Sequence, residues 1–245
     1  MPFPSKEELD LLYGAGYFER WGVGDAGRMA SVRAAKEATY RKFLATLPPR
    51  VAGGRLLDVG CAFGFMLGVA REHGYDAYGL DSNSAVIERA RQEFGGRVHA
   101  GPLDAQAFPG VRFRVVTLID VLEHIVDPAA LLSALAERLE PGGVVLAVLP
   151  NAASLTRWVL RRHWPHYAPE HLFLWTPSAL RRFAASHGWN VIQLRTGIRK
   201  TYTVHYLESY AKALGQWLPP GLGLLGSAPF SAPTGELLAL LERTA

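Results

Sequence analysis

Acidic side chains end two successive apolar runs of this sequence, and a glycine-containing turn lies between them. Asp58 comes two residues before Gly60 in the stretch Leu56-Leu57-Asp58-Val59-Gly60-Cys61-Ala62-Phe63-Gly64, and Asp81 ends the next run. Gly60 and Gly64 permit backbone conformations with positive φ and let a ligand approach the main chain closely. A helix that begins near Gly64 would direct free N–H groups and a partial positive charge at that ligand. This pattern indicates a turn that binds a nucleotide-like molecule.

The two carboxylates restrict which ligand this turn can bind. Asp58 would repel a pyrophosphate but suits a ligand that carries an ammonium group. An acidic side chain in the position of Asp81 can accept hydrogen bonds from both hydroxyls of a ribose, although an N-cap for the next helix is the alternative. The combination predicts an adenosine with an amino-acid end in place of a diphosphate, which is S-adenosylmethionine (SAM). Nicotinamide-dependent oxidoreductases also use a glycine turn, but Asp58 disfavours them.

The elements that must position these groups alternate along the chain. From Arg55 to Arg195, short β-rich runs are interleaved with segments of helical periodicity. This alternation is typical of a parallel sheet with helices on both faces, so we expect a doubly wound, Rossmann-like α/β fold. Strands are expected at Arg55–Val59, Ala77–Leu80, Arg97–Ala100, Arg114–Ile119 and Val144–Leu149. Helices are expected at Gly64–His73, Ser84–Phe94 and Pro128–Leu139.

Proline and glycine mark the ends of the later elements. Asp127-Pro128 combines a capping acceptor with a proline at the first helical position, and Thr176-Pro177 repeats this start. Pro141-Gly142-Gly143 cannot continue a helix and turns the chain into the next strand. Trp189–Thr196 is expected to be a strand. Gly235–Arg243 is apolar enough for a final strand, although its composition would equally suit a helix.

Three segments lie outside the regular alternation. Residues 1–54 read as helical, and we expect them to form an N-terminal cap on a domain of residues 55–245. Residues 151–175 contain a short helix and a loop rich in His, Trp and Pro, and residues 200–234 mix apolar residues with Gly and Pro. Both are expected to be insertions that form a small substrate cap or lid. Contact with a membrane surface or with a second copy of the chain is the alternative for the later insertion.

Five motifs, in the same order, make this sequence similar to a known family. They are LLDVGCAFG (56–64), GLDSN (79–83), VVTLIDVLEHIVDP (115–128), LEPGGVVLAVLPN (139–151) and EHLFLWTPSALRRF (170–183). The chain resembles the class I SAM-dependent methyltransferases, in particular the branch related to the ubiquinone-biosynthesis O-methyltransferases. This resemblance implies a seven-stranded, mostly parallel sheet whose last strand is antiparallel. It also implies SAM as the cofactor and S-adenosylhomocysteine (SAH) as its product.

The resemblance further implies which residues contact the cofactor. Those expected around its methionine and ribose portion are Gly60, Cys61, Ala62 and Gly64. Asp58 would lie behind them, near the amino group or the turn that holds it. Those expected at the adenosine are Asp81 on the ribose hydroxyls, Ser82 beside it, and Leu103 and Asp104 at the adenine edge. Asp120, or its backbone carbonyl, would face the methionine end.

Two histidines are candidate catalytic bases. A base with a pKa near neutrality would assist methyl transfer to a hydroxyl group, and histidine is the natural choice. His124 follows the fourth expected strand at the carboxyl edge of the sheet, and His171 lies in the expected substrate loop. Alternatively, His124 orders its turn and His171 bonds the backbone of an irregular loop. His163 and His166 lack a carboxylate partner at a suitable spacing, so no metal site is expected.

Other side chains near these motifs have less specific interpretations. Cys61 is expected to be a small apolar liner of the cofactor turn and not a nucleophile. Aromatic residues of the later segment could stack on an aromatic acceptor, but such residues more often pack in a core or lid. They are Trp158, Trp164, Tyr167, Phe173 and Trp175.

Composition limits the class of partner. The chain has 245 residues, of which 49% are hydrophobic and 20% charged, as expected for one large globular domain. No apolar run reaches the ~18–20 residues of a membrane span, and the start lacks the regions of a secretory signal. We therefore expect a cytoplasmic protein with no stable membrane insertion. The net charge of +4 is spread over single residues and pairs such as Arg161-Arg162, which argues against a nucleic-acid partner.

Together these observations predict a methyltransferase that acts on a small-molecule acceptor at oxygen, with a homodimer as a candidate assembly. Ile119-Asp120-Val121-Leu122 differs from the Asn-Pro-Pro-Tyr run with which amino-directed DNA and protein methyltransferases hold a planar nitrogen. A non-catalytic or regulatory SAM-binding protein remains the alternative from another class, because both would bind the cofactor. An RNA methyltransferase is a further alternative, although it would require a basic stripe.

Overall fold

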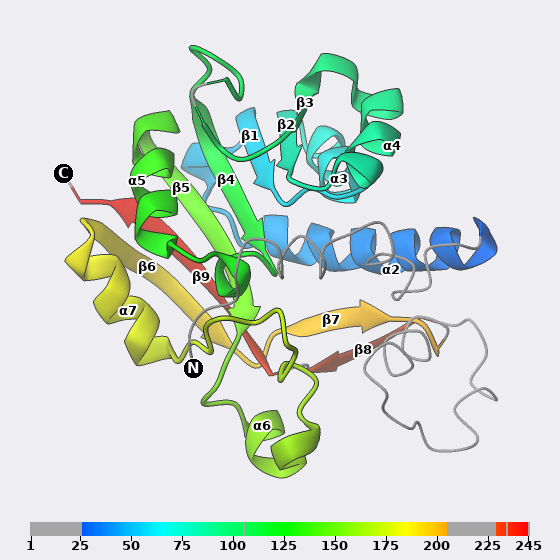
Figure 1. The fold of residues 1–245 in the computed structure, drawn as a ribbon, viewed down its shortest axis with the longest axis vertical. Coiled ribbons are helices and arrows are strands. Elements are labelled where there is room, and N and C mark those ends of the chain that lie inside the picture. Colours follow the sequence, from blue (N-terminus) through cyan, green and yellow to red (C-terminus); the bar gives the residue numbers. More distant parts are fainter. Residues whose placement is uncertain (1–25, 105, 205–228, 234, 245) are drawn as a thin grey trace.

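The computed structural model describes residues 26–104, 106–204, 229–233 and 235–244 (Figure 1). Seven strands form one sheet in the order β3-β2-β1-β4-β5-β9-β6. They are β1 (Gly54–Val59), β2 (Tyr75–Asp81), β3 (Val98–Ala100), β4 (Phe113–Ile119), β5 (Leu139–Pro150), β6 (Trp189–Thr196) and β9 (Glu236–Arg243). The expected doubly wound fold is confirmed.

The last strand of the sheet is antiparallel to both of its neighbours. β9 lies between β5 and β6, with Ala239 opposite Ala147 on one side and Leu194 on the other. The other strand pairs, β1 with β2, β1 with β4, β2 with β3 and β4 with β5, are parallel. Residues 236–243 are therefore a strand, which decides between the two conformations that their composition allowed.

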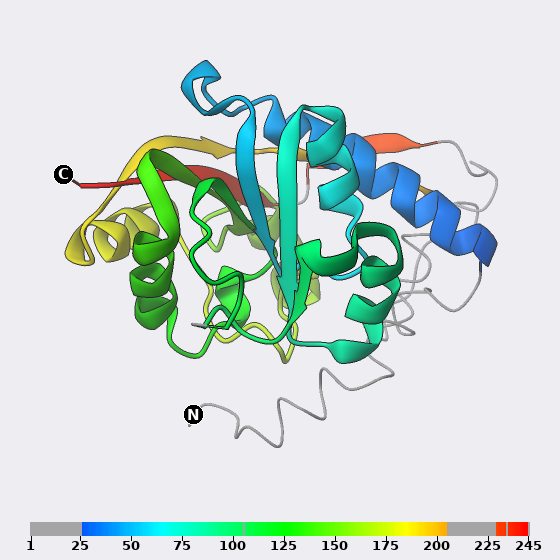
Figure 2. The same ribbon diagram turned by 90° about the horizontal axis from the view of Figure 1, so that it is seen from above.

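Helices cover both faces of the sheet (Figure 2). The α-helices of the described chain are α2 (Ala26–Leu44), α3 (Phe65–Glu72), α4 (Ser84–Phe94), α5 (Pro128–Arg138), α6 (Leu155–Leu160) and α7 (Pro177–Ser186). Short 3-10 turns include η4 (Leu122–His124) and η5 (Arg161–His163). α5 and α7 pack on one face of the sheet, whereas α2, α3 and α4 lie on the other.

Successive side chains of the central strands point to opposite faces of the sheet, so the strands contribute to a hydrophobic core on each face. Leu57, Val116 and Val145 belong to the hydrophobic cluster that includes α5 and α7. Their chain neighbours Leu56 and Val115 belong to the cluster on the α3 side. Because helices cover both faces, successive strand residues are buried alike, which explains the continuous apolar runs of the sequence.

The expected helix starts are confirmed by their capping bonds. The Asp127 carboxylate accepts a hydrogen bond from the backbone N–H of Ala130 at 2.9 Å, and the Thr176 hydroxyl accepts one from Ala179 at 3.1 Å. β5 is longer than expected, because it starts directly after α5 at Leu139. The Pro141-Gly142-Gly143 segment interrupts its pairing with β4 as a shift in register.

A second, two-stranded sheet was not expected from the sequence. β7 (Arg199–Tyr202) pairs antiparallel with β8 (Phe230–Pro233), and the described part of the 200–234 insertion therefore consists largely of these two strands. The backbone N–H of Thr201 donates to the Thr39 hydroxyl of α2 at 2.8 Å. Residues 205–228 lie outside the described part of the chain, so the role of this insertion as a lid stays a prediction, as does the boundary at residue 54.

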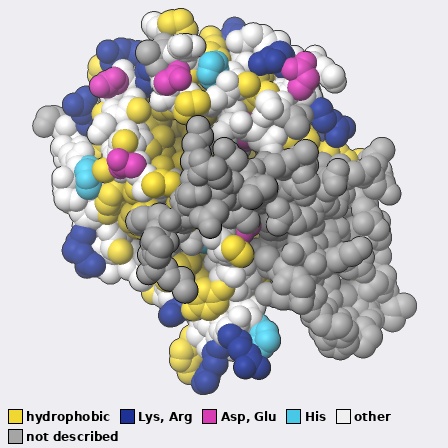
Figure 3. All heavy atoms as spheres, viewed as in Figure 1, with side chains coloured by type: hydrophobic (Ala, Val, Ile, Leu, Met, Phe, Trp, Pro, Cys, Tyr) yellow, Lys and Arg dark blue, Asp and Glu magenta, His cyan; other side chains and the backbone are white. Residues whose placement is uncertain are grey.

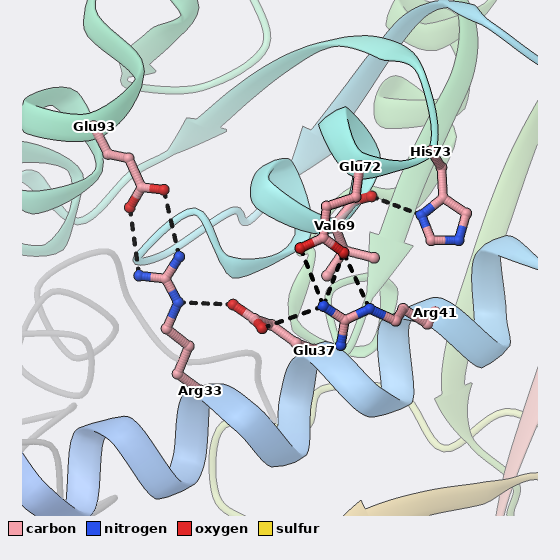
Figure 4. Close-up of polar contacts among 7 residues, drawn as sticks. All are labelled: Arg33, Glu37, Arg41, Val69, Glu72, His73 and Glu93. Carbon is pink, nitrogen blue, oxygen red and sulfur yellow. Dashed lines mark hydrogen bonds and ion pairs between the residues drawn. The ribbon is translucent and has the colours of Figure 1, made fainter.

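Charged side chains join α2 to the helices α3 and α4 (Figure 4). Arg41 contacts Glu72 of α3 at 2.8 Å, and Arg33 contacts Glu93 at the end of α4 at 3.4 Å. Glu37 lies between the two arginines, at 2.7 Å from Arg33 and 3.5 Å from Arg41. The opposite side of α2 is thereby left to face a cavity at the carboxyl edge of the sheet.

Candidate functional site

A cavity of about 590 Å³ lies where β1, β2 and β4 end. Its size falls in the range usual for small-molecule sites. Helix α2, the turn after β1, the segment after β4, the 156–171 region and the β7–β8 sheet all contribute to its walls. Polar side chains that line it are Lys36, Thr39, Asp81, Ser82, Asn83, Asp120, Glu123, His124, Thr156, His166, Glu170, His171, Lys200, Thr201 and Glu236.

The turn after β1 is held by the end of β2. The backbone N–H groups of Gly60 and Cys61 both donate to the Leu80 carbonyl, at 2.8 and 3.0 Å. Gly60 and Ala62 have φ values of 76° and 45°, in the left-handed region that glycine tolerates and alanine adopts at a cost. The Cys61 thiol packs over Gly79, where a β-carbon would lie 2.7 Å from Sγ. Burial raises the pKa of this thiol, so it stays protonated and serves as an apolar liner.

Asp81 closes this turn and faces the cavity. One carboxylate oxygen accepts the backbone N–H of Ala62 at 2.9 Å, and the other accepts that of Asn83 at 2.8 Å. Asn83, and not Asp81, caps α4, because its side-chain oxygen accepts from Val86. Each oxygen of a carboxylate has two lone pairs, so Asp81 keeps capacity for two further donors. Burial raises its pKa, although the two backbone bonds oppose that shift.

Asp58 lies behind the turn and does not line the cavity. It is 5% exposed and accepts a hydrogen bond from the Thr117 hydroxyl of β4 at 2.5 Å. Burial raises the pKa of Asp58 to about 7, and the bond from Thr117 opposes this shift. Asp58 therefore joins β1 to β4 directly below the turn.

A buried ammonium group organises the other end of the cavity. Lys200 Nζ lies 2.8 and 2.7 Å from the two carboxylate oxygens of Asp120 and 2.6 Å from Glu236 Oε1. Burial alone would raise the pKa of Asp120, but the charge of Lys200 holds it below its ordinary value. Conversely, burial would lower the pKa of Lys200, whereas Asp120 and Glu236 raise it well above its ordinary value. Asp120 also has a φ of 56°, so this ion pair holds a strained backbone.

Glu123 is a fully buried carboxyl group at the cavity wall. Its side chain is 0% exposed, and neither carboxyl oxygen has a hydrogen-bond partner among the described residues. Burial, reinforced by the nearby charge of Asp120, raises the pKa of Glu123 well above its ordinary value. A buried carboxyl group without a hydrogen-bond partner is costly for folding, and this one lines the cavity.

Two histidines lie beside this carboxyl group. The His124 and His171 rings pack edge to face with their centroids 4.7 Å apart. Nδ1 of His124 lies 3.0 Å from the Glu170 carbonyl, and Nδ1 of His171 lies 2.8 Å from the His166 carbonyl. Because a carbonyl only accepts, each Nδ1 carries the proton in the neutral ring and each Nε2 has a lone pair. Burial lowers the pKa of both rings, that of His124 to about 4.

Main-chain bonds bring these histidines together from distant segments. The backbone N–H groups of Leu172 and Phe173 both donate to the Glu123 carbonyl, at 2.8 and 3.2 Å. The substrate-loop region is thus attached to η4. As a result, one ligand atom from each of Glu123, His124 and His171 lies within 4.8 Å of the others. Such a group has the donor types of a divalent-cation site, and the expectation of no metal stays a prediction.

The structure places the expected site residues in two sets. Those that line the cavity are Gly60, Cys61, Ala62, Asp81, Ser82, Asp120, His124 and His171. Those that do not line it are Asp58, Gly64, Leu103 and Asp104. Gly64 is the N-cap residue before α3 and has a φ of 77°, and Leu103 packs against the core. The Asp104 carboxylate accepts the N–H groups of Gln106 and Ala107, which orders its own loop.

The aromatic lining of the cavity comes from residues that the sequence did not single out. These are Tyr40, Phe63, Phe65, Tyr202 and Phe230. In contrast, Trp164 and Trp175 are buried in packing, and Trp158 is 72% exposed. Lys200, Glu236 and Thr156 were also missed, since their contacts bring together segments far apart in the chain. Only Glu123 had a local signal, its position next to His124 in the DVLEH run.

Comparison with known proteins agrees with this architecture. Residues 32–194 match the methyltransferase domain family.

The chain belongs to the SAM-dependent methyltransferases.

Two relatives and two solved structures illustrate the relationship. A ubiquinone biosynthesis O-methyltransferase from Methylococcus capsulatus is 28% identical over 187 residues, which cover 66% of this chain and 78% of that relative. One from Pectobacterium carotovorum is 36% identical over 100 residues, or 38% of this chain and 41% of the relative. The magnesium protoporphyrin IX methyltransferase from Synechocystis PCC 6803, with bound SAH, has a TM-score of 0.61 at 16% identity, covering 98% of this chain and 100% of that one. A SAM-dependent methyltransferase from Archaeoglobus fulgidus has a TM-score of 0.60 at 16% identity over 86% and 94%.

SAM is the methyl donor of this methyltransferase, and the cavity of the described chain fits it. Asp81 retains hydrogen-bonding capacity at the cavity wall, and the small residues of the 60–62 turn leave the backbone accessible. Aromatic side chains close the same side of the cavity through Phe63 and Phe65, whose rings stack at 5.7 Å.

Among the described residues, no helix is long and apolar enough to cross a membrane.

Proposed function

We propose that this methyltransferase acts on a hydroxyl group of a small-molecule acceptor, with His124 and His171 as the groups that receive the hydroxyl proton. The observation that carries this proposal is the imidazole pair in the cavity wall. Both rings have Nδ1 occupied by a carbonyl, and they adjoin the unbonded carboxyl group of Glu123. In this proposal the pair is the proton acceptor at the cavity wall.

In this proposal the first two strands bind the cofactor. Asp81 accepts from the ribose hydroxyls, Gly60, Cys61 and Ala62 contact the methionine and ribose portion, and Ser82 lies beside the adenosine. Asp58 and Gly64 support the turn from below. Leu103 and Asp104 do not line the cavity, so their expected contact with the adenine edge stays a prediction outside this proposal. Asp120 faces the methionine end, where Lys200 fixes its carboxylate. The bound cofactor supplies an electrophilic methyl group on a sulfonium centre.

The histidines then serve the acceptor. Their lowered pKa values keep both rings neutral at neutral pH, so each Nε2 can accept a hydrogen bond from the acceptor hydroxyl. As the acceptor oxygen forms its bond to the methyl group, the bond between that methyl group and the cofactor sulfur would break to leave neutral SAH, and the O–H proton would move to an imidazole. The lowered pKa makes each ring a weaker base than free imidazole, but a methylated hydroxyl oxygen is a far stronger acid than either imidazolium. Orientation of the hydroxyl by a fixed ring contributes to the rate as well as the proton transfer. Glu123 adds a third polar group that can position the acceptor.

The relatives support oxygen as the acceptor atom, because those compared above are named O-methyltransferases of ubiquinone biosynthesis. The cavity supports a small molecule, since its volume of about 590 Å³ suits one ligand and its walls are partly aromatic. The alternative raised by the sequence, a non-catalytic SAM-binding protein, would bind SAM but release no SAH.

The test is the release of SAH from SAM with a panel of phenols, catechols, carboxylic acids and amines. We expect turnover with a hydroxyl-bearing acceptor and a loss of about 10²–10⁴-fold in kcat for the His124→Ala/His171→Ala double variant. SAM affinity by calorimetry should be unchanged. His187→Ala, at the end of α7 and away from the cavity, is the matched control. Full activity of the double variant would refute the base assignment, and preference for amines would refute the oxygen assignment.

A further inference from the structure

Glu170 contributes a carboxylate to the cavity wall beside the two histidines. It lies in the loop before α7, is only 9% exposed and lines the cavity. Its backbone carbonyl is the partner of His124 Nδ1 at 3.0 Å. The charge of its side chain opposes the lowering of the His171 pKa by burial, so the carboxylate lies near that ring. Glu170 is therefore part of the acceptor end of the cavity.

The carboxylate of Glu170 differs from the other ionised carboxylates of the cavity wall. Asp81 bonds to two backbone N–H groups, and Asp120 and Glu236 bond to Lys200. Among the residues that the structure describes, the Glu170 carboxylate has neither a hydrogen bond nor an ion pair. A carboxylate that is nine-tenths buried and unpartnered keeps its charge and its lone pairs for a molecule in the cavity.

Carboxylates outnumber ammonium groups along this wall. In the described part of the chain, the carboxylates that line the cavity are Asp81, Asp120, Glu170 and Glu236, and the ammonium groups are Lys36 and Lys200. Glu123 also lines it, but its raised pKa keeps it protonated. SAM adds one net positive charge, which still leaves negative charge in excess.

The cationic groups of the wall already face carboxylates. Lys200 is shared by Asp120 and Glu236. Lys36 lowers the pKa of Asp120, so its ammonium group also lies near a carboxylate. Nε2 of His166 lies 4.0 Å from Glu236 Oε1. An anionic acceptor would therefore have to compete with the protein's own carboxylates for a cation.

The basic side chains of the surface do not change this balance. Figure 3 shows Lys and Arg side chains around the margin of one face, with hydrophobic side chains nearer its centre. Arg157, Arg161 and Arg162 are exposed and do not line the cavity. They are hydrated and screened by salt, so they offer little to an anion inside the cavity.

We propose that Glu170 is a specificity-determining residue that restricts the acceptor to molecules without a carboxylate or phosphate group near the reacting hydroxyl. This proposal rests on the function proposed above, because it concerns the acceptor of that reaction. An anion that enters the cavity loses hydration, and a like charge a few ångströms away repels it more strongly than in water. An uncharged acceptor avoids both costs and can donate a hydrogen bond to Glu170.

Methyl 3,4-dihydroxybenzoate and 3,4-dihydroxybenzoate are a matched pair of probes, since at neutral pH they differ by one negative charge. Calorimetry with the SAH-loaded full chain measures their affinities, and SAH release from SAM measures kcat/KM. We expect the wild type to favour the ester at least about tenfold in both measurements. Glu170→Gln removes the charge and keeps the shape, so it should reduce this preference at least about threefold, mainly by improving the acid.

Two further variants make the result specific to the charge at this position. Glu170→Asp retains the charge and should retain a preference for the ester. Glu137→Gln removes an exposed carboxylate of α5, away from the cavity, and should behave as the wild type does. A preference that falls only in Glu170→Gln supports the proposal.

The contrary results are equally definite. Equal affinities for the two probes in the wild type, a preference that Glu170→Gln leaves unchanged, or failure of the ester to bind would each overturn the proposal. If the ester binds with this preference but yields no SAH, the proposed reaction fails with this acceptor and the charge selection stands. Turnover of both probes with equal kcat/KM would retain the reaction and remove the charge selection.

Discussion

At the β1–β2 end of the cavity, a carboxylate is held by backbone N–H groups, whereas at the β4–β9 end two carboxylates are held by a lysine. Asp81 bonds to the N–H groups of Ala62 and Asn83, which lie 19 and 2 residues away in the chain. Lys200 bonds to Asp120 and Glu236, which lie 80 and 36 residues away. The first arrangement is built from adjacent elements of one βαβ unit, and the second from elements that meet only in the folded protein.

Under the proposed function, this difference would separate cofactor recognition from reaction. Backbone donors fix the geometry of the cofactor turn whatever side chains surround it, so the same turn can serve many acceptors. Side-chain pairs at the other end depend on each partner, and there Glu123, His124 and His171 adjoin the ion pair of Asp120 and Lys200. We therefore expect loss of Lys200 to act on stability and loss of Asp81 to act on cofactor affinity.

The largest effect is expected from Lys200→Met. Removal of the ammonium group leaves the partly exposed carboxylate of Asp120 and the buried carboxylate of Glu236 without their shared partner. Loss of the buried pair with Glu236 should lower the free energy of unfolding by about 3–5 kcal/mol. Urea unfolding measures this loss. Lys42→Met is the control, because Lys42 donates only to the hydroxyls of Thr201 and Ser231 at the exposed side of β7–β8. Equal losses in both variants would contradict the role of Lys200 as the organising charge.

Asp58→Asn should change the pH dependence of stability. Burial raises the pKa of folded Asp58 to about 7, from a value near 4 in the unfolded chain. Between these values the folded state binds more protons, so the contribution of Asp58 to stability falls as pH rises and is level above pH 7. Asparagine is neutral throughout and can still accept from Thr117. The free energy of unfolding of the variant minus that of the wild type should therefore rise by up to about 1.4 kcal/mol per pH unit across this window.

Chemical unfolding at several pH values between about 4 and 8 tests this prediction. The lowered pKa of His124 makes the protein more stable as pH rises from about 4, which opposes the contribution of Asp58. Because His124 is present in both proteins, its contribution cancels when the free energy of unfolding of the wild type is subtracted from that of the variant. A difference that does not vary with pH would show that burial does not raise the pKa of the Asp58 carboxyl group.

A smaller effect on binding is expected at the cofactor end. Asp81→Ala should weaken SAM affinity by about 1–3 kcal/mol, the size of a lost charge-assisted hydrogen bond. Isothermal calorimetry measures the affinity. Asp76→Asn, at the opposite end of the same strand and paired there with Arg97, is the control and should bind SAM normally. Unchanged affinity in Asp81→Ala would remove the ribose assignment and leave Asp81 as a residue that only orders the turn.

The sequence predicted what depends on local pattern. The apolar runs and their bounding Gly and Pro residues placed the strands to within a few residues, and Trp189–Thr196 agrees with β6. Asp127 and Thr176 marked their helix starts because an N-cap bond joins residues only three apart. The glycine turn was equally readable, since its φ values require particular residue types.

What could not be predicted depends on pairing across the chain. β7 and β8 are short, Gly-free segments of mixed composition with no strand signal of their own, and each is a strand only through its pairing with the other, about 30 residues away in the chain. Lys200 has no motif around it, so its bonds to Asp120 and Glu236 appear only in the structure. The same holds for Glu123: its neighbour His124 was visible, but its burial without a hydrogen bond was not.

The place of β9 has a consequence for how this protein is made. β9 follows β6 in the chain but lies between β5 and β6, so β6 joins the sheet only through a strand that is synthesised later. During translation, the β5 edge and the apolar side of β6 must wait, exposed, until residues 236–243 leave the ribosome. Chains truncated before Glu236 and released from the ribosome should therefore depend on chaperones far more than the released full chain.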